Sequence, residues 1–213
     1  MPSTTAKMEI GQPRLFTARA VAVVCGYGAF LCIPVFLSVL VMSLRKFGVM
    51  SLLYPFLTMA ATTWFLPFGF GNPYVARLVR AFHPLAVKDQ DGFIVQLACS
   101  PRLRFGLRAL LEDADDIGYL SFTESELVFE GDSIKLSVPF DQMKQVRPAN
   151  VGLRGLFVYG RSSRIAVLGL PNVESLEFAE RSSCFLPTSR KTARRLYERL
   201  KSVAAGDTGR ARL

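Results

Sequence analysis

The stretch that decides the fold is residues 118–147, which read GYLSFTESELVFEGDSIKLSVPFDQMKQVR. Apolar and polar residues alternate within short segments, and polar turns separate these segments. Alternation with a period of two is typical of strands with one buried face, and tight turns join such strands into antiparallel hairpins. The stretch therefore predicts an antiparallel meander.

The same pattern continues on both sides. GFIVQLAC at 92–99 predicts a strand before the meander, and GLFVYG, RIAVLGL, SLEFAE and SSCFLP between 155 and 187 predict further strands after it. Seven or eight short strands favour a barrel or a sandwich. A helix is then predicted after residues 187–189, and its apolar residues recur at helical spacing: Ala193, Leu196, Tyr197, Leu200 and Val203. This helix is expected to cover the open side of the barrel.

The first third of the chain differs in composition. Residues 20–44 and 47–76 contain no Asp, Glu, Lys or Arg. A helix of roughly 20 apolar residues spans the hydrocarbon core of a bilayer, so each stretch is long enough to cross. We therefore expect a two-helix transmembrane hairpin at 20–71. A buried helical hairpin in a protein without a membrane anchor is the alternative.

Basic residues near the ends of the two stretches predict an orientation. Only Arg45 and Lys46 lie in the connecting loop, whereas six flank the outer ends: Lys7, Arg14, Arg19, Arg77, Arg80 and Lys88. This asymmetry predicts a protein of the bacterial inner membrane with both termini cytoplasmic. The expected order is an N-terminal tail at 1–19, the hairpin at 20–71, an amphipathic linker at 72–90, the β-rich domain at 91–204 and a basic tail at 205–213.

Two sets of residues are candidates for contacts in the membrane. Small residues let helices approach closely, and the candidates for helix packing are Ala22, Gly26, Ala29 and Ala60. Aromatic and basic residues favour the interface with lipid headgroups, and the candidates there are Trp64, Arg77 and Arg80. An ordinary linker helix is the alternative for the segment that carries the two arginines.

The β-rich part resembles a bacterial pleckstrin-homology-like, or GRAM-like, domain. Three features carry the resemblance: residues 118–122 open the first hairpin, Val138, Pro139 and Phe140 lead into 143–146, and the last helix closes the sheet. The resemblance covers about residues 91–204 and is clearest over 117–204. It implies a membrane helical hairpin followed by a pleckstrin-homology-like barrel or sandwich that a C-terminal α-helix caps.

In that family, the resemblance implies, basic residues in the first strand–strand loop bind lipid. The corresponding loop here, 123–126, holds Glu124 and Glu126 instead. Eight acidic residues and no Lys or Arg lie between 109 and 134, so this side should repel anionic headgroups. The acidic turn at 112–116 is expected to be solvated or to face a partner. The candidate patch for an anionic partner is on the last helix: Arg190, Arg194, Arg195 and Arg199. A solvated helix face is the alternative.

The sequence offers no constellation for catalysis. It has one histidine and four cysteines without CxxC spacing, and it lacks the phosphate-binding and nucleophile motifs. We expect no enzyme activity, cofactor, metal, small-molecule substrate or nucleic acid. The partners expected are membrane lipids and other membrane proteins.

The function expected is a membrane-anchored interaction or scaffold protein. An accessory subunit of a respiratory or photosynthetic membrane complex, or a sensor of anionic lipid, are the alternatives. The choice between lipid and protein, the oligomeric state and the domain start at 91 or 117 stay open.

Overall fold

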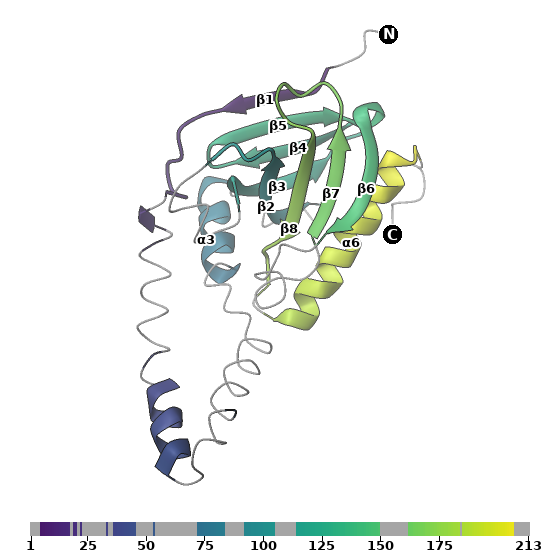
Figure 1. Cartoon of the computed structure of the whole chain (residues 1–213). Coiled ribbons are helices and arrows are strands. Elements are labelled where there is room, and N and C mark those ends of the chain that lie inside the picture. The colour runs from purple at the N-terminus through teal and green to yellow at the C-terminus, as the bar shows by residue number, and fades with distance from the viewer. Residues whose placement is uncertain are drawn as a thin grey trace.

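A computed structural model describes residues 5–17, 19, 20, 22, 33, 36–45, 53, 72–83, 92–104, 114–149, 162–183 and 185–206. A curled sheet with a long C-terminal helix dominates this part of the chain (Figure 1). The strands are β1 (Lys7–Ile10), β2 (Phe93–Ser100), β3 (Asp116–Phe122), β4 (Glu126–Gly131), β5 (Ile134–Pro139), β6 (Met143–Ala149), β7 (Ser162–Val167) and β8 (Ser175–Glu180). The helices are α3 (Asn72–Phe82), the 3₁₀ turn η3 (Phe140–Gln142) and α6 (Leu186–Ala204). Residues 36–45 are helical as well.

The eight strands form one antiparallel sheet in the order β1-β5-β4-β3-β2-β8-β7-β6. The stretch at 118–147 supplies β3, β4, β5 and most of β6, as its alternating pattern predicts. Among the described strands, the curled sheet ends in two edges, β1 and β6, so it is a half-barrel in place of a closed barrel or a two-sheet sandwich. Strand β2 lies in the middle, between β3 and β8, so the sheet extends upstream of residue 117.

Alternate residues of β2 face opposite sides of the sheet and belong to different apolar clusters. Val95 and Leu97 face the inner side, where Leu196 and Leu200 of α6 complete the main core. The apolar stripe of α6 is therefore buried against β6, β7 and β8. Because burying a large aliphatic side chain stabilises by roughly 1.5–3 kcal/mol, this packing fixes α6 on the inner face.

The outer side of the sheet carries a second cluster. Val75 and Val79 of α3 pack there against Ile117 and Tyr119 of β3, and Phe16 from the N-terminal segment fills the same cluster. Helix α3 thus packs on the outer face beside β2 and β3. The segment expected as an N-terminal tail contributes both this buried phenylalanine and the edge strand β1.

The prediction of a transmembrane hairpin is wrong. No helix in the part of the chain that the structure describes is long and apolar enough to cross a membrane. The predicted inner-membrane location with two spans is corrected with it. Of the proposed packing and interface residues, Ala22 is described as helical, while Gly26, Ala29, Ala60 and Trp64 lie outside the described residues.

Candidate functional site

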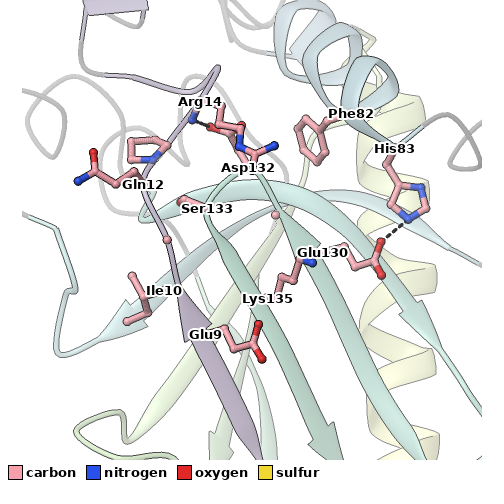
Figure 2. Close-up of a pocket in the computed structure, with 13 residues that line it drawn as sticks. Glu9, Ile10, Gln12, Arg14, Phe82, His83, Glu130, Asp132, Ser133 and Lys135 are labelled. Carbon is pink, nitrogen blue, oxygen red and sulfur yellow. Dashed lines mark hydrogen bonds and ion pairs between the residues drawn. The ribbon is translucent and has the colours of Figure 1, made fainter.

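A cavity of about 660 Å³ opens where three parts of the chain meet (Figure 2). Its walls are the end of β1 with the residues after it, the end of α3, and the turn between β4 and β5. The register places Glu9 of β1, Lys135 of β5 and Glu130 of β4 side by side, so negative, positive and negative charges alternate across three strands. Opposite charges at such positions compensate one another.

His83, the one histidine of the chain, closes this cavity beside α3. Its Nε2 atom lies 2.6 Å from Oε2 of Glu130, and its ring centroid lies 4.9 Å from that of Tyr119. The hydroxyl of Ser133 accepts a hydrogen bond from the guanidinium of Arg104. His83 and Ser133 therefore contact different partners, and no hydrogen bond joins them as a base and a nucleophile in the described part of the chain.

Asp132 forms the rear wall of the cavity. Its carboxylate accepts hydrogen bonds from the backbone N–H groups of Arg14, Leu15 and Phe16, at 2.9–3.1 Å. These bonds hold the N-terminal segment against the sheet, so the carboxylate serves the fold. Among the described residues, no group of three or more His, Cys, Asp or Glu side chains could hold a metal ion.

The acidic turn at 112–116 is expected to be solvated or to face a partner. The structure describes residues 114–116 of it, and there the expectation is wrong. Asp115 and Asp116 are almost fully buried. Asp115 accepts from the backbone N–H groups of Cys99, Leu103 and Arg104, and Asp116 from those of Ser133 and Ile134. Both carboxylates therefore bind the main chain. Burial raises the pKa of Asp116 above its ordinary value.

Glu180 joins the end of β8 to the first turn of α6. Its two carboxylate oxygens accept hydrogen bonds from the hydroxyls of Ser182 and Ser189. Burial raises the pKa of this carboxyl as well, and the serine hydrogen bonds oppose that shift. Burial, with a smaller contribution from Asp115, also raises the pKa of the Cys99 thiol to about 12, so this cysteine packs as an uncharged side chain.

The four arginines of the predicted basic patch on α6 do not share one environment. Arg190, Arg194 and Arg195 are exposed, and Arg194 pairs with Glu198 at 2.8 Å. Arg199 is half-buried, and its guanidinium lies 5.5 Å from the centroid of the Phe122 ring, so it packs on the sheet. On α3, Arg77 and Arg80 are exposed, away from the buried valines. The α3 arginines and the α6 arginines lie on elements that cover opposite faces of the sheet.

The open edge at β6 is a feature that sequence analysis did not single out. Lys144, Gln145 and Arg147 are exposed there, and Pro148 lacks an N–H group, which suits a strand with one unpaired side. Among the described residues, β7 is the only strand that pairs with β6. The signal in the sequence is MKQVRP itself, which places two basic residues and a proline on one short strand.

Neither a protein-family model, nor a curated protein, nor a solved structure matches this chain. Its function therefore has to be argued from its own residues.

Proposed function

We propose that this chain is a non-enzymatic interaction protein, and that its β-rich domain, of the pleckstrin-homology-like kind, docks a segment of a partner protein along β6. A meander whose open side a C-terminal helix covers is what that resemblance implies, and the order of the strands and α6 supports it. The observation that carries the proposal is the edge of the sheet at β6, seven residues long and without a second neighbour among the described strands.

An unpaired strand presents a row of backbone N–H and C=O groups, and an extended segment of another protein can satisfy them by adding a strand. The opposite edge offers less, because β1 has four residues and the chain following it turns across the sheet to Asp132. The cavity of Figure 2 is a weaker candidate, because its charged groups already compensate one another.

Site-specific photo-crosslinking tests the proposal. A benzoylphenylalanine is placed at Gln145 on β6 or, as the matched control, at Gln12, which is also exposed but lies at the cavity rim. The full chain is then irradiated in the cells that produce it. We expect a discrete crosslinked protein from position 145 that position 12 does not give. Equal products from both positions, or none from position 145, contradict docking at β6.

A further inference from the structure

Among the described residues, the outer face of the sheet at β6 carries a positive charge with no acidic partner. The register places Arg147 of β6 directly opposite Arg164 of β7, and like charges at such positions repel. Arg164 turns to its other neighbour, Glu177 of β8, at 2.9 Å. The second oxygen of Glu177 accepts from the hydroxyl of Ser162 at 2.5 Å. Glu177 is thus occupied, and no described carboxylate pairs with Arg147.

The inner face of the same strand is apolar. Val146 lies opposite Ile165 and packs against the main core. A strand added outside β6 would therefore meet two different surfaces. Its side chains on the outer face would lie beside Arg147, and those on the inner face would lie beside Val146, because successive side chains of a strand alternate between the two faces.

The charges at this edge also exclude one kind of partner. Lysine, arginine and proline on an edge strand prevent two sheets from pairing edge to edge. A second copy of this chain would bring Lys144 and Arg147 against the same two residues, and the repulsion disfavours that pairing. The exposed basic residues of α6 add attraction for negative charge over a longer range. The charges at β6 thus disfavour pairing with β6 of a second copy and favour pairing with a strand that carries negative charge.

We propose that the segment that docks on β6 is an extended strand in which acidic and apolar residues alternate, with an acidic side chain opposite Arg147 and an apolar one beside Val146. This inference rests on the proposed function and specifies the chemistry of the partner. The acidic residue supplies the carboxylate that Arg147 lacks, and the apolar residue extends the inner face of the sheet.

Three labelled octapeptides of equal length and apolar content test the inference by fluorescence anisotropy with the full chain: (Glu-Val)₄, (Gln-Val)₄ and (Lys-Val)₄. We expect the acidic peptide to bind most tightly and to weaken as salt rises. The variant Arg147→Glu should bind (Glu-Val)₄ about fivefold or more weakly and gain affinity for (Lys-Val)₄, since a cross-strand pair changes from attractive to repulsive. Arg77→Glu, the same exchange on exposed α3, should leave both affinities unchanged.

The reversal of preference separates docking from a loss of fold, because an unfolded variant gains no affinity for the basic peptide. Equal binding of the acidic and neutral peptides, or an Arg147→Glu variant that keeps the wild-type preference, overturns the inference about the partner. Those results leave docking itself intact if the crosslink from position 145 forms. A missing crosslink overturns the proposed function and the inference together.

Discussion

The Nε2 atom of His83 lies 2.6 Å from Oε2 of Glu130, and this contact joins the end of α3 to β4. Replacing His83 with alanine removes the contact and the ring packing on Tyr119. We expect the free energy of unfolding to fall by about 1–2 kcal/mol and amide exchange in α3 to accelerate. Urea denaturation and hydrogen exchange measure the two effects. Glu124→Gln, in an exposed turn, is the control; unchanged exchange in α3 contradicts the prediction.

Asp132 should matter more than its turn position suggests. Asp132→Ala leaves three backbone N–H groups of residues 14–16 without their acceptor and should lower the free energy of unfolding by about 1–3 kcal/mol. Proteolysis should then cut the chain within 5–17. Asp141→Ala, at an exposed position of η3, serves as the control, and equal resistance to protease in both variants would speak against a role for Asp132.

Two glycines provide a matched pair. A Cβ atom at Gly118 would lie 2.4 Å from the carbonyl oxygen of Glu130 and 2.6 Å from Cα of Gly131, both in the backbone of β4. A Cβ at Gly11 would meet only the carbonyl oxygen of Ser133, at 3.5 Å. We expect Gly118→Ala to destabilise the chain by about 1–3 kcal/mol through overpacking, and Gly11→Ala to change stability by less than about 0.5 kcal/mol. Thermal denaturation that ranks them equally refutes the close approach of β3 and β4.

The buried carboxyl of Glu180 predicts a dependence of stability on pH. Burial raises its pKa above the ordinary 4.5, so below that pH the group is protonated in both folded and unfolded chains. As the pH rises above 4.5, the carboxyl ionises in the unfolded chain while it stays protonated in the folded chain. The free energy of unfolding therefore falls, by up to about 1.4 kcal/mol per pH unit, until the pH reaches the folded-state pKa.

Glu180→Gln removes this ionisation and can still bond both Ser182 and Ser189. The variant should therefore be more stable than the parent chain at pH 7, and this advantage should vanish near pH 4. Urea denaturation at the two pH values measures it. The exposed Glu174→Gln should show no such difference. A Glu180→Gln variant that loses stability equally at both pH values would falsify the sign of the shift.

Local patterns in the sequence identified β4, β5, β7, β8 and the last helix, because alternation of apolar residues at Leu127, Phe129, Leu136 and Val138 directly reflects one buried face. The strand expected at 182–187 is wrong, since α6 begins at Leu186, and the strand expected at 155–160 lies outside the described residues. The pattern carries no information about which strands pair. Consequently the sequence predicts only a tail at 1–19, although Lys7 of β1 pairs with Ser137 across the sheet.

The candidate site was less accessible to such reasoning. His83 and Glu130 are 47 positions apart in the sequence, and Asp132 reads as an ordinary turn residue although it binds the backbone 116–118 residues away. The transmembrane prediction rested on a length rule for spanning helices, which long uncharged runs such as 20–44 satisfy. Among the described residues, however, no helix is long and apolar enough to cross a membrane.

Strand β2 pairs on one side with β3, close in sequence, and on the other with β8, where Val95 lies opposite Glu180. During synthesis on a ribosome, one side of the central strand β2 therefore stays unpaired until residues 175–180 of β8 have emerged. Long-range pairing of this kind slows folding and leaves an unpaired strand edge, which is prone to aggregation, in the nascent chain. Chaperone demand should accordingly peak while residues between β3 and β8 are being added.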